Sequence, residues 1–353
     1  MKPHFVPLTV QDVRRETADC VSVAFERPAE GFAFDAGQYL TLKTTIDGTE
    51  VRRSYSLCSA PHEPELRVAI KRVPGGKFST WANDHLRPGD TLEVMPPQGK
   101  FALQPDSTRA ARYVGFVAGS GITPVFSILK TVLEREPESS FLLFYGNRNG
   151  DSIIFREELE ALKNRYLGRL SLHYVLSREN PGSDLFHGHL DDLKCRRFGQ
   201  IFFDPATVER FFLCGPEQMI HTLRAELGAL HVPNERIKFE LFGTAAPQPK
   251  ATRRLREQTQ RGAAVTLIQD GVTTRFVFEP NDENLLDAGM RAGADLPFAC
   301  KGGVCCTCRA RILDGAVDMM VNYALEPDEV AAGYVLTCQA VPTTEAVTVS
   351  FDD

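Results

Sequence analysis

Several patterns that would define a class of function are missing from this 353-residue chain. No apolar run approaches the roughly 20 residues that a membrane-spanning helix requires. The opening residues, MKPHFVPLTVQDV, lack the apolar core of a signal peptide, so we expect a cytoplasmic protein with no membrane partner. Neither H-E-x-x-H nor a Walker A loop occurs, and no pair of carboxylates has a defined catalytic spacing. Nothing here therefore indicates a zinc protease, a P-loop enzyme or a paired-carboxylate enzyme.

The chain also lacks a large net charge, although its charge is unevenly placed. The whole sequence has 40 Lys and Arg against 46 Asp and Glu, a net charge of −6. Residues 263–353 contain 5 Lys and Arg against 14 Asp and Glu, a net charge of −9. Residues 1–262 contain 35 Lys and Arg against 32 Asp and Glu, a net charge of +3. An acidic end argues against nucleic-acid binding there and suits a small domain that docks on basic surfaces. The alternative is that the acidity serves only solubility.

Residues 1–107 are predicted to form an antiparallel β-barrel. VSVAFERP, QYLTLKTTIDGTEVRRSYSL and ELRVAIKRV are rich in β-branched and aromatic residues with partial alternation of period two. Asp47-Gly48 lies between two such runs and is a strong hairpin signal. The short turn sequences RPGD, PPQG and PGG separate the runs, as expected of a small barrel.

From about residue 108 the pattern changes to strands that alternate with helices. RYVGFVAG, FLLFYGNR and RFFLCG are apolar strand runs, each followed by a segment with helical spacing. This alternation predicts a parallel, doubly wound sheet that ends with KFELF and closes a domain of residues 108–242. Residues 243–262 have no apolar period and five basic residues, which predicts a flexible linker. Residues 263–353 form the third predicted domain, with a hairpin that turns at Asp270-Gly271.

Four of the nine cysteines lie in the stretch CKGGVCCTC at 300–308. The spacing Cys300-x4-Cys305-x2-Cys308, with Cys338 further along in VLTCQ, is that of plant-type [2Fe–2S] sites, and these four are the predicted metal ligands. Zinc is the alternative, but structural zinc sites usually use two short ligand pairs and the second pair is missing here. Cys306 lies off the ligand spacing and is interpreted as a small neutral filler.

The strand that ends in RSYSL carries the groups that a flavin needs. Arg53 and Tyr55 lie on one face of the predicted strand, where a guanidinium can bind a pyrophosphate and a flat ring can stack on the flavin. Ser56 would supply a donor near the reactive nitrogen. Residues 75–80, GGKFST, then lead into a predicted helix whose free amides suit a pyrophosphate. The alternative for this turn is an ordinary helix start with Ser79 as the N-cap.

Two glycine-containing turns follow strands of the second domain. Residues 119–124, GSGITP, let the backbone approach phosphates closely, and Pro124 fits the first turn of a helix. The stretch is neither G-x-G-x-x-G nor the G-x-S-x-G elbow of hydrolases, since Pro124 and Ala118 occupy the deciding positions. Cys214-Gly215-Pro216 ends a strand at the sheet edge where ligands bind, although Cys214 alone is as well explained by a buried core thiol.

Taken in order, these stretches resemble the ferredoxin–NADP reductase superfamily followed by a plant-type ferredoxin. The shared motifs are R-x-Y-S, the G-x-x-S/T turn, G-x-G-I-x-P and C-G-P, with LPFAC and VLTCQ around the cluster ligands. The resemblance implies a multi-domain fold of β, α/β and α+β parts. These are an FAD-binding antiparallel β-barrel, a doubly wound NAD(P)-binding domain and a β-grasp-like [2Fe–2S] domain.

Carried over residue by residue, the resemblance implies two cofactor sites. The FAD site would use Arg53, Tyr55, Ser56, Leu57, Lys71, Val73, Gly76, Lys77, Ser79 and Thr80. The nicotinamide site would use Gly119, Ser120, Gly121, Thr123, Pro124, Ser177, Arg178, Cys214, Gly215 and Pro216, and Phe242 would lie near the flavin. Tyr55, Ser56 and Cys214 are the catalytic candidates.

Ser177-Arg178 ends a predicted strand at the position where the superfamily recognises a 2′-phosphate. A hydroxyl and a guanidinium suit that dianion, so the expected coenzyme is NADPH, with NADH as the alternative. The resemblance implies an oxidoreductase that passes electrons from NADPH through FAD and the cluster to a separate protein.

The expected partners are terminal oxygenase subunits of a multicomponent monooxygenase. The resemblance is strongest to reductase subunits of phenylacetyl-CoA epoxidases, which serve aerobic phenylacetate breakdown. Reductases of steroid 9α-hydroxylases or of other ring-hydroxylating oxygenases are the alternative. A non-catalytic redox sensor is disfavoured by the intact flavin and nicotinamide motifs.

Overall fold

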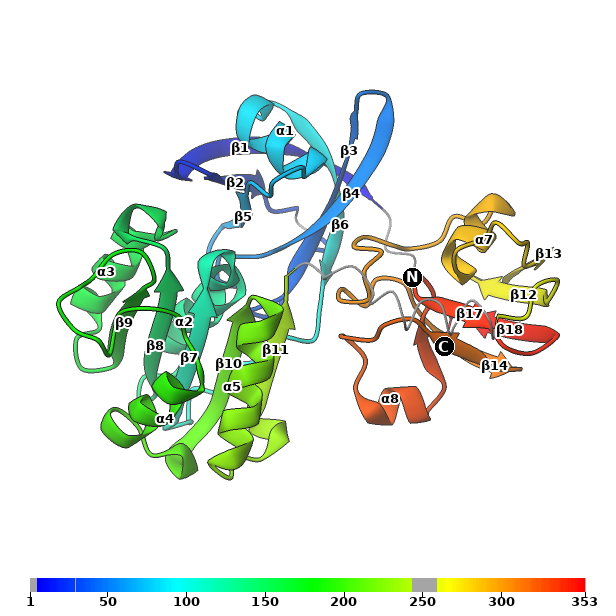
Figure 1. Cartoon of the computed structure of the whole chain (residues 1–353). Coiled ribbons are helices and arrows are strands. Elements are labelled where there is room, and N and C mark those ends of the chain that lie inside the picture. Colours follow the sequence, from blue (N-terminus) through cyan, green and yellow to red (C-terminus); the bar gives the residue numbers. More distant parts are fainter. Residues whose placement is uncertain (1–4, 29, 243–258, 353) are drawn as a thin grey trace. The chain divides into compact units, whose positions relative to one another are not determined.

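A computed structural model of the chain describes residues 5–28, 30–242 and 259–352 (Figure 1). Phe5–Phe242 form one compact unit, and the described residues from 259 onward belong to a second. Most of the predicted linker, residues 243–258, lies outside the described residues. Gln260 and Gly262, which end the predicted linker, already donate backbone hydrogen bonds to Pro342 and Phe278 of the second unit. Among the described residues, no helix has both the length and the apolarity to cross a membrane.

The first unit begins with an antiparallel barrel. Its elements are β1 (Val6–Thr17), β2 (Cys20–Glu26), β3 (Tyr39–Ile46), β4 (Thr49–Ser56), β5 (Glu65–Lys71), α1 (Lys77–His85) and β6 (Thr91–Gln98). The six strands are ordered β4-β3-β6-β1-β2-β5, and a bridge between Leu57 and Val68 connects the two edges of the sheet. β3 and β4 form the predicted hairpin, in which Asp47 and Gly48 take φ angles of 50° and 71°. Positive φ at both turn residues is what a two-residue hairpin with a type I′ turn requires.

The rest of the first unit is a parallel sheet covered by helices (Figure 1). Its elements are β7 (Arg112–Ala118), α2 (Ile122–Arg135), β8 (Ser140–Asn147), α3 (Arg156–Arg165), β9 (Leu170–Leu176), α4 (Asp192–Ile201), β10 (Val208–Gly215), α5 (Glu217–Ala229) and β11 (Ile237–Leu241). The strand order is β11-β10-β7-β8-β9, so the chain starts in the middle, builds one side, and then crosses to the other. This is the predicted doubly wound arrangement, and its direction reverses between β7 and β10, where such folds bind ligands.

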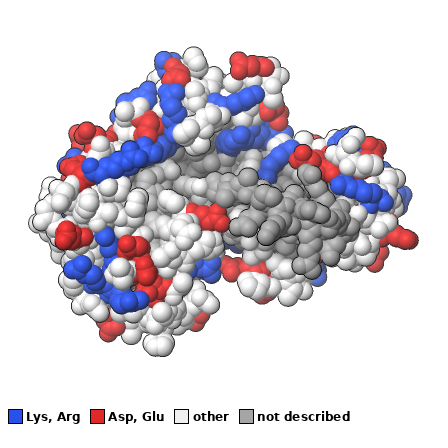
Figure 2. Space-filling view, viewed as in Figure 1, with Lys and Arg blue, Asp and Glu red and all other residues white. Residues whose placement is uncertain are grey.

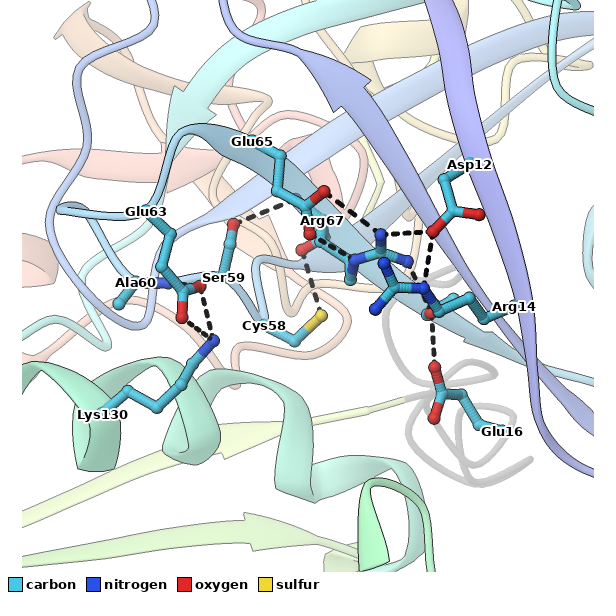
Figure 3. A network of polar contacts seen from close by, with 11 residues as sticks. Asp12, Arg14, Glu16, Cys58, Ser59, Ala60, Glu63, Glu65, Arg67 and Lys130 are labelled. Atoms are coloured by element: carbon cyan, nitrogen blue, oxygen red, sulfur yellow. Dashed lines mark hydrogen bonds and ion pairs between the residues drawn. The ribbon is translucent and has the colours of Figure 1, made fainter. Parts of the chain in front are cut away.

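The barrel has a hydrophobic core of its own, and a second core joins some barrel residues to the parallel sheet, which explains why the two parts form one unit. Phe101 of the barrel packs edge-on against Phe212 of β10, with ring centroids 5.7 Å apart. Polar contacts join the same two parts (Figure 3). The Lys130 ammonium on α2 donates to both carboxylate oxygens of Glu63, at 2.7 and 2.5 Å, and Ser127 donates to the carbonyl of Ser59 at 2.6 Å.

A second polar cluster in Figure 3 braces the barrel itself. The guanidinium of Arg67 on β5, which is 7% exposed, donates to Asp12 at 2.7 Å and to Glu65 at 2.6 Å. It also donates to the Ser22 hydroxyl at 2.9 Å. A buried charge is tolerated when it is paired and hydrogen-bonded in this way, so the cluster ties β1, β2 and β5 together.

A buried carboxylate pins the segment that leads from the barrel into the sheet. Glu136, which follows α2, has no exposed surface. It accepts hydrogen bonds from the Tyr113 hydroxyl at 2.9 Å, the Ser139 hydroxyl at 2.8 Å, the Arg109 guanidinium at 2.9 Å and the backbone amide of Asp106 at 3.1 Å. The Glu136 side chain therefore connects the segment that contains Asp106 and Arg109 to both β7 and the loop before β8.

The described part of the second unit is a small mixed sheet with two short helices. Its elements are β12 (Ala264–Gln269), β13 (Val272–Val277), α7 (Leu285–Arg291), β14 (Arg309–Asp314), β15 (Val317–Met319), α8 (Pro327–Ala331), β16 (Tyr334–Leu336), β17 (Ala340–Pro342) and β18 (Ala346–Ser350). The main sheet is ordered β13-β12-β18-β14-β16, with β12 and β18 parallel and the other pairs antiparallel. β12 and β13 form the predicted hairpin, with Asp270 and Gly271 at φ 50° and 72°. On the face shown in Figure 2, acidic and basic side chains are both present on each unit.

Candidate functional site

The predicted flavin strand β4 presents its polar groups as the sequence suggests. Arg53 is exposed, and its guanidinium donates to the carbonyl of Arg52 at 2.7 Å. Among the described residues it forms no ion pair, so its charge is available to an anion. Tyr55 packs against Phe78 of α1, with ring centroids 5.5 Å apart, and Ser56 is buried at the end of the strand. This set suits a flavin diphosphate because the cation and the flat ring lie on one face of β4.

The turn before α1 has the predicted shape, but the helix cap differs from the expected alternative. Gly76, and not Ser79, is the N-cap of α1, because the helix begins at Lys77. The Ser79 hydroxyl accepts a hydrogen bond from the Val73 amide at 3.1 Å and so holds the turn from inside the helix. A Cβ on Gly76 would lie 2.7 Å from that hydroxyl oxygen. Val73 remains 57% exposed, as expected of a residue that touches a ligand.

A cavity of about 680 Å³ opens at the switch point of the parallel sheet. Seven of the predicted site residues line it: Lys71, Gly119, Ser120, Ser177, Gly215, Pro216 and Phe242. Gly121, Thr123, Pro124 and Cys214 lie behind its wall and are buried. The sheet edge, the barrel strand β5 and the residue after β11 thus meet at one place, which is where a nicotinamide and a flavin could come together.

Glycine is required where the two turns of the sheet approach each other. A Cβ on Gly121 would lie 2.1 Å from the carbonyl oxygen of Cys214, a distance that no side chain can adopt. Gly119 has a φ of 54°, and its carbonyl accepts a hydrogen bond from the Tyr145 hydroxyl at 2.9 Å. The Thr123 hydroxyl donates to the carbonyl of Ser120 at 3.0 Å and so supports the same turn. The predicted phosphate turn therefore packs directly on the end of β10.

Glu240 contacts a predicted site residue, Ser56, although sequence reasoning did not select it. The Ser56 hydroxyl donates to Glu240 Oε2 at 3.0 Å, across 184 residues of chain. Burial raises the pKa of Glu240 to about 8, against the lowering effect of the Ser56 hydrogen bond. Burial also raises the pKa of the Cys214 thiol well above its ordinary value, and Cys214 pairs with Glu240 in the register of β10 and β11. Burial thus favours the neutral form of both the Glu240 carboxyl and the Cys214 thiol. The single acidic residue in KFELF was the signal that could have found it.

Two basic side chains with a permanent charge, Lys71 and Arg148, line the cavity. Ser177 and Arg148 both line the cavity, whereas Arg178 is absent from its lining. The two loops are joined by backbone hydrogen bonds from the amides of Ser177 to Asn147 and of Arg178 to Arg148, at 2.9 and 2.7 Å. Asn147 is 8% exposed, and neither polar atom of its amide has a hydrogen-bond partner among the described residues. Since buried amides are normally paired, Asn147 has the chemistry of a group that a ligand satisfies.

The four predicted cluster ligands gather as two pairs of thiols. The hydrogen bond between Cys300 and Cys305 lowers the pKa of Cys300 and raises that of Cys305, and the bond between Cys308 and Cys338 lowers the pKa of Cys338 and raises that of Cys308. Within the described residues, no three His, Cys, Asp or Glu side chains are placed to hold one metal ion. Two thiol pairs fit a two-iron cluster, in which each iron takes two protein ligands, better than a single zinc ion.

The loop that carries three of these thiols is tightly curled. Lys301, Gly303 and Cys306 have φ angles of 49°, 78° and 54°. The amide of Gly302 donates to Cys300 Sγ at 3.3 Å, as expected of a loop that directs amides at sulfur. The Cys306 thiol contacts the carbonyl of Ala324 at 3.5 Å, away from the two pairs, in line with its predicted role as a filler.

Comparison with known families assigns all three parts of the chain. The family models that match are "Oxidoreductase FAD-binding domain" at residues 7–103, "Oxidoreductase NAD-binding domain" at 116–225 and "2Fe-2S iron-sulfur cluster binding domain" at 267–343. Fold and site together thus define an oxidoreductase that uses FAD, a nicotinamide dinucleotide and a [2Fe–2S] cluster. These matches confirm the predicted fold class and cofactors.

Two relatives narrow this class. The chain is 46% identical to one of the subunits of 1,2-phenylacetyl-CoA epoxidase from Escherichia coli K12, over 99% of this chain and 98% of the relative. It is 35% identical to the ferredoxin reductase component of 3-ketosteroid-9-alpha-monooxygenase from Rhodococcus rhodochrous, over 98% of this chain and 97% of the relative. The chain therefore belongs, together with these two relatives, to the family of ferredoxin-reductase-type proteins.

Solved structures show the same fold. Phthalate dioxygenase reductase matches with a TM-score of 0.61 and 23% identity, over 98% of both chains. An intact type IV self-sufficient cytochrome P450 monooxygenase matches with a TM-score of 0.71 and 23% identity, over 98% of this chain and 41% of that one. The three-part fold is thus shared well beyond the range of close sequence similarity.

Proposed function

We propose that this reductase donates its electrons to the terminal oxygenase subunits of a phenylacetyl-CoA epoxidase. The observation that carries the proposal is the 46% identity to the Escherichia coli epoxidase relative, which extends over 99% of the chain and so includes all three domains. The steroid monooxygenase reductase is 35% identical over a similar length and supports the broader assignment to oxygenase systems. A cytoplasmic location follows from the need for four reduced thiols as cluster ligands, and cell fractionation would test it.

The residues of the first unit have distinct proposed roles. Arg53 and the amino end of α1 bind the flavin pyrophosphate, because a helix start presents backbone amides and Arg53 supplies a cation that forms no ion pair within the described part of the chain. Tyr55 and Val73 hold the flavin ring, and the neutral Ser56 and Glu240 pair offers hydrogen bonds at its edge. Cys214 and the turn at Gly119 shape the nicotinamide pocket. When FAD is bound, it supplies the conversion of a two-electron hydride into single electrons.

Reconstitution with purified components tests the partner. The complete reductase, NADPH and the oxygenase subunits of a phenylacetyl-CoA epoxidase are expected to consume NADPH and oxygen only when phenylacetyl-CoA is present. The oxygenase subunits of a 3-ketosteroid 9α-monooxygenase with their steroid substrate serve as the matched comparison. Faster turnover with the steroid system than with the epoxidase would overturn this choice of partner while leaving the reductase function intact.

We further propose that NADPH is the preferred coenzyme and that Arg148, with Ser177, binds its 2′-phosphate. Replacing Arg148 with alanine should raise the KM for NADPH about tenfold or more, since a hydrogen bond to a charged group contributes about 1.5–3 kcal/mol. The KM for NADH should change much less, because NADH lacks the phosphate. Steady-state reduction of ferricyanide measures both values.

Arg178→Ala is the matched control for this prediction. Arg178 neighbours the cavity in sequence but does not line it, so we expect a smaller effect on the KM for NADPH than that of Arg148→Ala. Equal losses with NADPH and NADH in Arg148→Ala would remove the 2′-phosphate role. A larger effect of Arg178→Ala would return that role to Arg178.

A further inference from the structure

Gln339 links the two chain segments that carry the predicted cluster ligands. Its side-chain Nε2 donates to Cys338 Sγ at 3.4 Å and to the carbonyl oxygen of Lys301 at 2.9 Å. The first bond reaches the fourth ligand, and the second reaches the loop that carries the other three. Gln339 is only 4% exposed, so both hydrogen bonds form away from bulk water.

The partners of Nε2 determine the orientation of this amide, whose Oε1 is buried with no hydrogen-bond partner among the described residues. Both partners of Nε2 are acceptors, a sulfur and a carbonyl, so the NH2 group and not the amide oxygen must point at them. The backbone is held on both sides, because the Gln339 amide donates to Leu336 at 2.8 Å and its carbonyl accepts from Met320 at 2.9 Å. A Cβ on Gly303 would meet Gln339 Cγ at 3.3 Å, so the side chain also packs against the curled loop.

We propose that Gln339 is a positioning residue that raises the reduction potential of the [2Fe–2S] cluster through its hydrogen bond to Cys338 Sγ. The proposal rests on the proposed ligand set. Reduction adds one negative charge that is shared by the cluster and its ligand sulfurs. An N–H donor stabilises that extra charge more strongly in the reduced state than in the oxidised state, particularly in a buried site. Gln339 therefore favours the acceptance of electrons from the flavin.

Replacing Gln339 with methionine tests this role in the complete, cofactor-loaded protein. Methionine has a similar length and no donor, so we expect the equilibrium constant for cluster reduction to fall about tenfold, which is a decrease of about 59 mV in midpoint potential for one electron. Gln339→Glu keeps the shape, lacks the donor and brings a carboxylate, and should lower the potential at least as much. Anaerobic spectroelectrochemical titration of the cluster absorbance measures the shift, and the flavin potential in the same sample should stay unchanged.

Thr337→Val is the matched control, because Thr337 ties the same two segments without touching sulfur. Its hydroxyl donates to the carbonyl of Cys308 at 2.9 Å, and it is 1% exposed. This variant should lower the resistance of the cluster to chelators but leave its potential unchanged. A bound cluster whose potential is the same in wild type, Gln339→Met and Gln339→Glu would overturn the proposal. A shift of the midpoint potential in Thr337→Val equal to that in Gln339→Met would also overturn it. Absence of iron from the wild-type protein would instead refute the ligand set itself.

Discussion

Replacing Cys338 with serine is expected to abolish electron transfer to cytochrome c and other one-electron acceptors that require the cluster, while NADPH still reduces the flavin. Cys338 is the only proposed ligand outside the loop at 300–308, and its thiol pairs with that of Cys308. Removing it leaves one iron with a single protein thiolate. We expect cluster affinity to fall by at least about 100-fold, since even residues that only support a ligand contribute 10–100-fold. The proposed flavin and nicotinamide residues lie in the other unit, so we expect their geometry to be unchanged.

Stopped-flow absorbance at the flavin band measures flavin reduction. The iron content of the purified protein measures whether the cluster is retained. Cys306→Ser is the matched control, since it changes the same residue type in the same loop. Its thiol contacts the Ala324 carbonyl and lies outside the two pairs, so the cluster should be retained. Loss of flavin reduction in Cys338→Ser would show that the two units are not separable in function. Loss of the cluster in Cys306→Ser would show that the ligand set is wrong.

Replacing Glu136 with alanine is expected to lower the free energy of unfolding of the first unit by about 3–5 kcal/mol, as found when one partner of a buried ion pair is removed. The change leaves Tyr113, Ser139, Arg109 and the Asp106 amide without their shared acceptor. Tyr113 is fully buried, so its hydroxyl cannot turn to water. Urea unfolding followed by the fluorescence of Trp81, the one tryptophan of the chain, reports on this unit.

Glu134→Ala provides the comparison for Glu136→Ala. Glu134 is two residues away on α2 and pairs with Arg165 at 3.3 Å, but the two side chains are 40% and 66% exposed. Exposed pairs contribute about 0–1 kcal/mol, so this variant should unfold almost as the wild type does. Equal destabilisation by the two substitutions would mean that burial of the Glu136 carboxylate does not account for the effect.

The parts of the fold that were predictable depend on local chemistry. The hairpins at Asp47-Gly48 and Asp270-Gly271 were predictable because both turns demand positive φ, which these residues tolerate. The parallel sheet was predictable because buried strands and amphipathic helices have different apolar periods. The spacing of the thiols in CKGGVCCTC indicated a two-iron site because three ligands from one loop need that separation.

The parts that were missed depend on contacts between distant residues. Glu240 was overlooked because nothing near it in sequence shows that Ser56 lies 3.0 Å away. Arg148 was not selected because the strand end that carries Ser177 was considered alone, while two neighbouring loops line the cavity; the role of Arg178 stays a prediction. The alternative prediction that Ser79 is the N-cap of α1 is wrong, because the helix begins at Lys77 and the Ser79 hydroxyl accepts a hydrogen bond from the Val73 amide.

The sequence by itself thus determined the three-domain order, the two hairpins, the doubly wound sheet and the cysteine spacing typical of a [2Fe–2S] site, since each is encoded within a short stretch. Only the tertiary structure decided which side chains meet at the sites. It brought Ser56 to Glu240, Arg148 to the cavity of the parallel sheet and the Gln339 amide to the Lys301 carbonyl. The physical reason is that protonation, hydrogen bonding and close packing depend on neighbours in space, and folding brings together residues that are far apart in the chain.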